Sequence, residues 1–295
     1  MKIVVGIPAF NEEENIGEII TKVKEIANEV IVCNDNSTDS TKEIAEQMGA
    51  IVVNHERNLG YGGAIRTIFL KARELDADIL VTMDGDGQHR IDDVNVVTKP
   101  ILEKQLDVVI GSRFLEEDQK DIPKYRKVGI KAITKLANIS LENPVTDSQS
   151  GFRAYSKQAL EKINPSENGM GISNEILIKA SKLKMKILEV PIKILYEGDT
   201  STHNPISHGA SVILSTLKFI SIEHPLKFYG IPGAVFLGIG IIFMIMTIQG
   251  FSETRQILLS IAIISVGTIL IGTILLMSSI ILYSVVNIVK EQSSK

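Results

Sequence analysis

Short apolar segments rich in β-branched residues alternate with amphipathic segments along the first two thirds of the chain. Such apolar segments predict buried strands, and apolar residues at helical spacing predict helices between them. The predicted strands are Met1–Ile7, Glu29–Cys33, Ile51–Val53 and Ile79–Met83. The first predicted helix repeats apolar residues from Ile16 to Ile26, with Asn11 as its N-cap and Glu14 three residues later. This alternation predicts an α/β domain with a mostly parallel sheet built by right-handed crossovers.

The last quarter of the chain has a different pattern. Tyr229–Gln249 and Ile257–Val289 are mostly apolar, and the second carries no charged residue. Each is long enough to cross a hydrocarbon core of about 30 Å, and the link Gly250–Gln256 fits a helical hairpin. We therefore expect a transmembrane hairpin over residues 229–289, with spans at 229–249 and 257–289, the second extending beyond the bilayer. A buried pair of soluble helices is the alternative, but a charge-free run of this length makes a poor soluble helix.

Residues 206–228 join the two parts of the chain. Their apolar residues fall on one helical face, with polar residues opposite: Ala210, Ile213, Leu214, Leu217 and Ile220. This pattern predicts an amphipathic helix that lies in the membrane interface, and an ordinary packing helix is the alternative. The expected organisation is a globular domain over residues 1–205, an interfacial helix over 206–228 and the hairpin after it.

The sequence also predicts an orientation in the membrane. The amino terminus has one lysine before a short apolar strand and an acidic stretch, which is not the pattern of a signal peptide. An unexported globular domain stays in the cytoplasm, and two spans return the carboxyl terminus to that side. Lys290 and Lys295 agree with the excess of positive charge on cytoplasmic segments. We expect an integral protein of the cell membrane with its globular domain in the cytoplasm.

Chemically active side chains follow the predicted strands. Asp84 and Asp86 come directly after Ile79–Met83, and Gln88 continues the series. Residues two apart in an extended segment share a face, so both carboxylates can converge on one divalent cation, Mg²⁺ or Mn²⁺. Asp35 follows the second strand and is expected at the same edge of the sheet, where open α/β sheets bind ligands. A solvated acidic turn is the alternative for an isolated Asp-x-Asp pair.

Composition excludes some classes of function. The formal net charge is −4 and the pI is about 5.8, which argues against a nucleic acid as partner. Cys33 is the single cysteine, so no intrachain disulfide can form, and its presence fits a reducing compartment.

Several motifs occur in an order and spacing that resemble glycosyltransferase family 2: Pro8–Glu12, Asp35–Asp39, Asn58–Ala64, Asp84–His89 and Gly111–Phe114. Asp147–Arg153 and Glu189–Ile192 continue the resemblance, which covers roughly residues 1–200. It is strongest to the branch that contains dolichyl-phosphate mannose synthases and polyprenyl-phosphate glucosyltransferases. The resemblance implies a GT-A fold, which is Rossmann-like, and inverting transfer from a nucleotide-sugar. The candidate donors are GDP-mannose, UDP-glucose and UDP-N-acetylhexosamine.

The motif match also implies roles for single residues. It implies nucleotide contacts at Pro8, Asn11, Glu12 and Asp35. It implies a metal and diphosphate site at Asp84, Asp86 and Gln88, where Mg²⁺ or Mn²⁺ would neutralise the charge of the leaving diphosphate.

The chain departs from the family pattern at two places. Asn34 precedes Asp35 where the family usually has two acidic residues, so one charged contact is expected at that turn. Ile130 stands where the family often has a serine one turn after Arg126.

The expected acceptor is a polyprenyl or dolichyl phosphate. A phosphate monoester has a second pKa near 6, so at neutral pH it needs positioning more than deprotonation. Arg113 and Arg126 can hold phosphate oxygens bidentately, and Lys131 adds positive charge beside them. We expect Asp86, Arg113 and Arg126 to carry the catalysis. For the stretch Lys124–Lys135, a basic surface helix is the alternative.

Three other functions fit parts of the sequence. Transfer to a hydroxyl of a lipid-linked saccharide or a glycerolipid would need a general base, for which Asp147 and Glu175 are the candidates. A non-catalytic membrane scaffold on a transferase fold would not need the acidic motifs that this chain retains. A soluble type of nucleotidyltransferase would have no use for the hairpin. The expectation is therefore a membrane-anchored transferase of one hexose, which serves glycosylation.

Overall fold

The computed structural model describes residues 1–115, 124–193, 213–214, 216–218, 220–222, 224–256 and 258–293. The chain forms two compact units. Met1–Thr216 is called the sheet unit below, and Leu217–Lys295 is called the hairpin unit.

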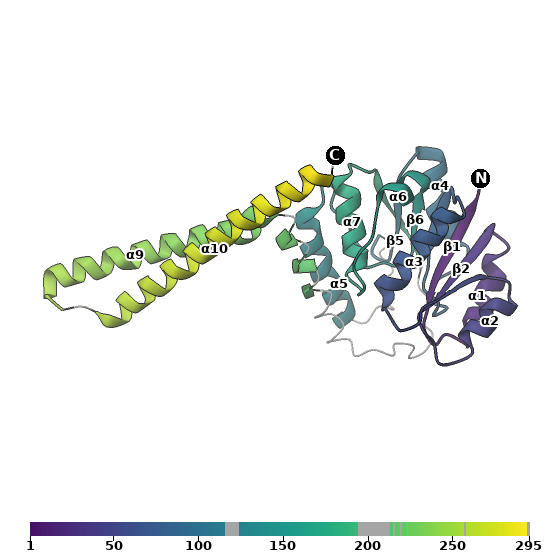
Figure 1. The fold of residues 1–295 in the computed structure, drawn as a ribbon, viewed down its shortest axis with the longest axis horizontal. Coiled ribbons are helices and arrows are strands. Elements are labelled where there is room, and N and C mark those ends of the chain that lie inside the picture. Colours follow the sequence, from purple (N-terminus) through teal and green to yellow (C-terminus); the bar gives the residue numbers. More distant parts are fainter. Residues whose placement is uncertain are drawn as a thin grey trace. The chain divides into compact units, whose positions relative to one another are not determined.

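A seven-stranded sheet forms the centre of the sheet unit (Figure 1), in the order β3-β2-β1-β4-β6-β5-β7. The strands are β1 (Ile3–Ala9), β2 (Glu29–Asn34), β3 (Ile51–Asn54), β4 (Ile79–Thr82), β5 (Val108–Ser112), β6 (Arg153–Ser156) and β7 (Ile187–Pro191). All neighbouring strands are parallel except β6, which runs antiparallel to both β4 and β5. The predicted α/β fold with a mostly parallel sheet is confirmed.

Helices pack on both faces of this sheet (Figure 1). The helices of the sheet unit are α1 (Ile16–Val23), α2 (Thr41–Gln47), α3 (Tyr61–Glu74), α4 (Asp93–Lys104), α5 (Lys124–Ala137), α6 (Lys157–Lys162) and α7 (Ile172–Lys182), with a short 3₁₀ turn, η1 (Asn138–Ser140). One core cluster joins the sheet to α1, α2 and α4 through apolar residues such as Val5, Ile20 and Val97. On the other face, Phe69 of α3 packs edge-on against Tyr155 of β6.

Close packing on the α3 face has a clear cause in the sequence. A Cβ atom at Gly6 of β1 would lie 2.2 Å from Cγ2 of Ile68. The glycine therefore allows α3 to approach β1 more closely than a residue with a side chain would. This approach places the amino terminus of α3 beside the strand ends that carry the acidic motifs.

One local prediction is wrong. Asn11 was the expected N-cap of the first helix, but α1 begins at Ile16 and Asn15 precedes it. Asn11 instead has a φ of 57°, and its side-chain oxygen accepts a hydrogen bond from Thr38 N at 2.8 Å. Its own N–H donates to Ser37 Oγ at 3.0 Å. These tertiary bonds join the loop after β1 to the loop after β2, and they override the local capping signal.

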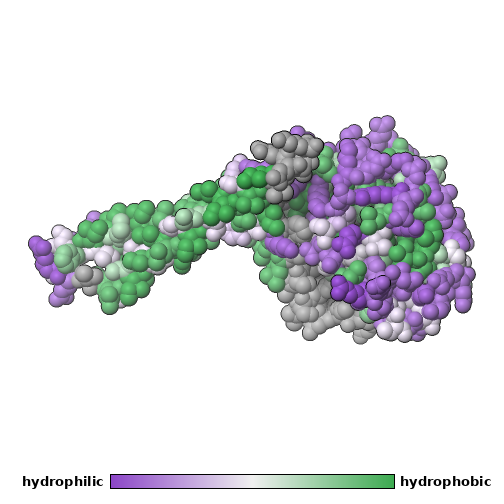
Figure 2. All heavy atoms as spheres, in the orientation of Figure 1, coloured by the Kyte–Doolittle hydropathy of each residue, from purple (hydrophilic) through white to green (hydrophobic). Residues whose placement is uncertain are grey.

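Among its described residues, the hairpin unit contains a π-type turn and two long helices: η2 (Leu226–Gly230), α9 (Ile231–Thr254) and α10 (Leu259–Ser293). Leu226–Thr254 and Leu259–Ile288 are long and apolar enough to cross a membrane, by length and composition. Figure 2 shows the apolar side chains that cover them. The predicted pair of apolar helices is confirmed, whereas the interfacial helix stays a prediction because 206–212, 215, 219 and 223 lie outside the described residues.

Small residues bring α9 and α10 together. A Cβ atom at Gly272 would lie 2.6 Å from Leu237 N and 2.8 Å from Gly233 O. Ser265 Oγ donates to Gly240 O at 3.0 Å across the same interface. Close backbone approach and interhelical hydrogen bonds are the main sources of helix association in lipid. The hairpin therefore has its own packed interface.

The amino terminus of α3 is covered by the loop that precedes α7. Gly62 N and Gly63 N both donate to Asn168 O, at 2.8 and 3.2 Å. A Cβ atom at Gly62 would lie 2.3 Å from Glu167 O and 2.6 Å from Gly169 O. The glycines at this turn thus permit the loop to dock on the helix, because two backbone segments meet there without a side chain between them.

This contact gives a stability prediction. Gly62→Ala should lower the free energy of unfolding by about 1–3 kcal/mol, because the new methyl group meets backbone atoms that have little freedom to move. Gly129→Ala in α5 is the matched control, since nothing lies within 4 Å of its Cβ position. The control should be neutral or stabilising by about 0.5–1 kcal/mol. Denaturant unfolding of the detergent-solubilised protein measures both, and equal effects would contradict the account.

Candidate active site

The acidic motifs meet at one edge of the sheet. β2, β1 and β4 are adjacent and parallel, so their carboxyl ends lie side by side. The loops that follow them carry Asp35, Glu12, and the pair Asp84 and Asp86. β5 ends nearby in the same direction and is followed by Arg113. The structure therefore brings together the strand-end residues that the sequence predicted at one edge.

Asp84 presents an unsatisfied oxygen at this edge. Its Oδ1 is buried and accepts no hydrogen bond, while Oδ2 lies 3.4 Å from Nε2 of His89. Burial opposes ionisation of Asp84, but the hydrogen bond and charge of His89 and the charge of Arg113 hold its pKa below the usual value. A buried carboxylate oxygen that lacks a donor is an expected place for a cation.

Glu12 lies close to both members of the pair. Burial raises the pKa of Glu12 to about 7, and the charges of Asp86 and Asp84 add to the rise. Asp86 itself folds back locally, where its Oδ1 accepts the N–H of Gln88 at 3.0 Å. Three carboxyl groups thus share one small region, and their mutual repulsion favours a bound cation or a proton.

Gly151 lets the Tyr61 hydroxyl and the Asp84 carboxylate come close to its backbone, because a Cβ atom there would lie 2.5 Å from the Tyr61 hydroxyl. A Cβ atom at this position would lie 2.9 Å from Asp84 Oδ1 and 3.1 Å from Oδ2. The orphan oxygen and the crowded negative charge together fit a divalent cation. No group of three or more His, Cys, Asp or Glu residues in the described part of the chain is arranged to hold a metal. Asp84 and Asp86 would therefore share the ion with phosphate oxygens and water, which is usual for Mg²⁺.

Asp35, in the loop after β2, holds a neighbouring turn in place. It is 4% exposed, and its Oδ1 and Oδ2 accept the N–H groups of Leu59 and Gly60, each at 2.8 Å. Nδ1 of His55 lies 2.6 Å from Oδ1. One lone pair of Oδ2 has no bond among these contacts. Asp35 therefore fixes the glycine-rich turn, and its capacity for a nucleotide contact is limited to that oxygen.

His55 was not identified from the sequence. A single histidine after a strand has no spacing that distinguishes it from a surface residue, and its role depends on tertiary contacts. Its Nε2 lies 2.8 Å from Thr67 Oγ1 and 3.5 Å from the Cys33 sulfur. Burial raises the pKa of Cys33 to about 12, and the Asp35 charge contributes. Cys33 is accordingly a protonated core thiol and no nucleophile.

Arg113 forms a bidentate ion pair with Asp147. Nε lies 2.6 Å from Oδ2 and Nη2 lies 2.8 Å from Oδ1, and Asp147 is fully buried. Glu189 of β7 holds the loop that carries Asp147, since its Oε1 accepts hydrogen bonds from Asp147 N at 2.9 Å and from Thr146 Oγ1 at 3.0 Å. This chain of contacts fixes the guanidinium plane of Arg113 at the active edge.

Glu175 of α7 is also fully buried, and both of its carboxylate oxygens have hydrogen-bond partners. Its two oxygens accept Ser166 N at 2.9 and 3.0 Å, and Oε2 accepts Glu167 N at 2.8 Å. Lys179 Nζ lies 2.6 Å from Oε1. The side chain thus ties down the loop that docks on α3.

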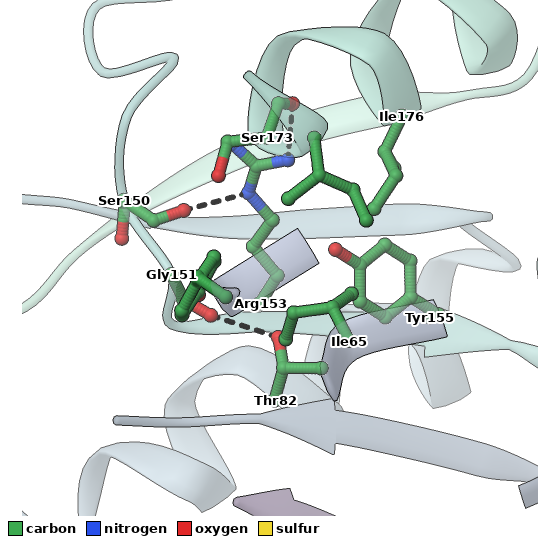
Figure 3. Close-up of a pocket in the computed structure, with 10 residues that line it drawn as sticks. Ile65, Thr82, Ser150, Gly151, Arg153, Tyr155, Ser173 and Ile176 are labelled. Atoms are coloured by element: carbon green, nitrogen blue, oxygen red, sulfur yellow. Dashed lines mark hydrogen bonds between the residues drawn. The ribbon is translucent and has the colours of Figure 1, made fainter. Parts of the chain in front are cut away.

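A small pocket lies between α3, β4, β6 and α7 (Figure 3). Arg153 points into it and is 1% exposed. Its guanidinium donates to three carbonyl oxygens, each at 2.8 Å: Ser150, Ser173 and Ser148. Thr82 Oγ1 donates to Gly151 O at 2.8 Å, so β4 holds the same segment. These bonds fix the loop that carries Asp147 and Gly151 beside Asp84.

The remaining predicted residues lie on α5 and at the end of β1. Lys131 is exposed. Arg126 belongs to α5, but its side chain is outside the described residues. Ile130 is 8% exposed, so the position where the family often has a serine faces the core here. Pro8 is the second-last residue of β1 and pairs with Cys33 of β2.

Comparison with known proteins agrees with this geometry. The model of glycosyl transferase family 2 matches residues 4–164. An uncharacterized protein of Methanocaldococcus jannaschii is 38% identical over 72% of this chain and 87% of its own length. A UDP-N-acetylglucosamine–dolichyl-phosphate N-acetylglucosaminyltransferase of Methanococcus voltae is 34% identical, over 70% of this chain and 89% of its own.

A solved structure supports the fold. Glucosyl-3-phosphoglycerate synthase of Mycobacterium tuberculosis, in complex with Mn²⁺, uridine diphosphate and glucosyl-3-phosphoglycerate, aligns with a TM-score of 0.57. The alignment covers 74% of this chain and 79% of the synthase at 24% identity. With the family model matching more than half of its length and its acidic motifs gathered at one sheet edge, the chain belongs to glycosyl transferase family 2.

Proposed function

We propose that this glycosyltransferase moves one hexose from a nucleotide-sugar to a polyprenyl or dolichyl phosphate, with inversion, at the cytoplasmic face of the membrane. Candidate donors are GDP-mannose, UDP-glucose and UDP-N-acetylhexosamine. One observation carries the choice of acceptor: Asp147 and Glu175, the two carboxylates predicted as candidates for a general base, are saturated by hydrogen bonds. An acceptor that is already ionised needs no such base.

The saturation can be followed atom by atom. Oδ1 of Asp147 accepts Arg113 Nη2 at 2.8 Å and Gln149 N at 3.2 Å. Its Oδ2 accepts Arg113 Nε at 2.6 Å and Arg113 N at 3.2 Å. A carboxylate has about four acceptor sites, so none remains for the proton of a hydroxyl. Glu175 is occupied in the same way by Ser166, Glu167 and Lys179.

A lipid phosphate supplies its own nucleophile. Its second pKa is near 6, so most of it is dianionic at neutral pH. The protein must then hold the phosphate close to the anomeric carbon, and positioning of this kind can account for several kcal/mol of the barrier. In this proposal Arg113 and Arg126 hold the phosphate oxygens, with Lys131 as a third positive group. Similarity to the Methanococcus voltae enzyme, whose name specifies dolichyl phosphate, supports this acceptor class.

The donor occupies the acidic edge of the sheet. We assign the nucleotide to the loop of Pro8, Asn11 and Glu12 and to the free lone pair of Asp35. Asp84 and Asp86, with Gln88 beside them, would hold Mg²⁺ or Mn²⁺. When bound, the ion would neutralise the charge that develops on the leaving diphosphate. The similar Mycobacterium tuberculosis synthase contains Mn²⁺ and uridine diphosphate, which supports a divalent cofactor in this fold.

The hairpin supports a membrane arrangement. We assign residues 1–205 to the catalytic domain, 206–228 to an interfacial helix and 229–289 to two spans, with both ends of the chain in the cytoplasm. This places the nucleotide-sugar site on the side where nucleotide-sugars are made and the acceptor phosphate at the bilayer surface.

The metal assignment predicts a large loss on mutation. Asp86→Ala should lower kcat by on the order of a hundred- to a thousandfold, because charge on the leaving group is no longer neutralised. EDTA should abolish transfer by the unmodified protein, and Mg²⁺ or Mn²⁺ should restore it. Asp92→Ala is the control, since that side chain is 89% exposed and lies outside the site. Full activity in EDTA would refute the metal.

The acceptor assignment predicts a selective effect. Arg126→Ala should raise the KM for the lipid phosphate or lower kcat, for a total loss of about 30- to 150-fold, which corresponds to about 2–3 kcal/mol. The KM for the nucleotide-sugar should stay nearly unchanged. Arg126→Lys should recover part of the activity, since an ammonium keeps the charge and loses the planar fork. Arg90→Ala is the matched surface control. If Arg126→Ala kept the wild-type kcat and KM for the lipid phosphate, the role of holding the acceptor phosphate would pass to Arg113 and Lys131.

The topology predicts opposite locations for two reporters. A fusion at residue 253, in the last turn of α9 and between the predicted spans 229–249 and 257–289, should report the outer side of the membrane. A fusion after residue 295 should report the cytoplasm. Both reporters on one side would exclude the hairpin.

A further inference from the structure

One exposed face of the sheet unit combines apolar and basic residues. Val128, Lys131, Lys135 and Ile139 follow one another at intervals of three or four residues along α5 and η1. Val128 is 68% exposed and Ile139 is 55% exposed, and both lysines are exposed as well. These four residues are called the α5 face below. The opposite side of α5, which includes Ile133, is buried in the core.

The charge of this helix differs from that of the whole chain. Residues 124–137 contain five lysines and arginines and no aspartate or glutamate, whereas the chain has a net charge of −4. Val128 is the most exposed of the large apolar residues described in the sheet unit. Leu70 and Leu102 are also exposed, at 51% and 47%, but each has a glutamate close by on its own helix. The α5 face joins this exposed apolar surface to positive charge, with no acidic residue on its own helix.

This combination has the chemistry of a surface that binds an anionic bilayer. Lysines place their charge among lipid phosphates while their alkyl stems cover apolar surface. Apolar side chains between them enter the boundary between headgroups and acyl chains. Each lysine near an anionic membrane contributes about a fivefold factor to its attraction.

We propose that the α5 face lies against the anionic headgroups of the bilayer that holds the hairpin unit. The proposal rests on the membrane anchorage given under the proposed function. It adds a second, independent membrane contact on the catalytic part of the chain. Because Arg126 and Lys131 belong to the same helix, this contact would hold them at the depth of the acceptor phosphate.

The absence of tryptophan gives a direct test, because one substitution introduces a single fluorescent reporter. Full-length Val128→Trp is reconstituted into nanodiscs of anionic phosphatidylglycerol with brominated acyl chains. Its emission should shift to the blue and lose about half or more of its intensity relative to unbrominated lipid, because bromine quenches only groups that reach the acyl boundary. Leu70→Trp is the matched control, with similar exposure and a different surface, and its emission should be unchanged by bromine.

A charge reversal tests the electrostatic part. Lys135→Glu, combined with Val128→Trp, should remove most of the quenching and make the remainder sensitive to salt. Lys99→Glu on α4 is the control, because that lysine is 70% exposed outside the α5 face and its reversal should leave quenching unchanged.

The outcomes separate this inference from the proposed function. An unquenched Val128→Trp protein that remains in the nanodisc and transfers sugar overturns the α5 contact and leaves the function intact. A blue shift that depends on protein concentration and not on bromine shows that a second copy covers the face, which also overturns it. A protein that does not incorporate into nanodiscs refutes the membrane anchorage itself.

Discussion

The ion pair between Arg113 and Asp147 is the interaction on which the active edge depends. It joins the end of β5 to the loop before β6, and Glu189 extends the connection to β7. An arginine whose Nε and Nη2 both donate to one carboxylate keeps a fixed plane, which suits recognition of phosphate oxygens. The same bonds saturate Asp147 and so remove it as a base. This buried pair therefore fixes the position of the Arg113 guanidinium. By removing Asp147 as a base, it also favours an acceptor nucleophile that is already ionised.

A second constraint acts on the donor side. Glu12, Asp84 and Asp86 are crowded, and the pKa of Glu12 rises to about 7 as a result of burial and its acidic neighbours. The loops cannot separate these groups freely, because Arg153 fixes the segment that carries Gly151 and Asp35 fixes the glycine-rich turn. The framework thus holds these negative charges close together. A cation and the diphosphate it binds would relieve that repulsion, which links donor binding to the stability of the site.

The sequence predicted the elements whose signals are local and periodic. The positions of β1 to β4 and the shared edge of Asp35, Asp84 and Asp86 follow from apolar runs and from the direction of parallel strands. Other features depend on contacts between distant segments. His55 supports Asp35, Asn168 covers the amino terminus of α3, and Glu175 closes the loop before α7. The misassigned cap at Asn11 has the same origin, since hydrogen bonds to the next loop decide its conformation.

The nature of the acceptor nucleophile is the central claim, and one measurement tests it directly. The reconstituted protein is incubated with a panel of nucleotide-sugars and with either polyprenyl phosphate or the matching polyprenol, and products are identified by mass spectrometry. The account predicts one hexose added to polyprenyl phosphate and no product from the polyprenol, because Asp147 and Glu175, the two predicted candidates for a base, are saturated by hydrogen bonds. Efficient glycosylation of the polyprenol would contradict it.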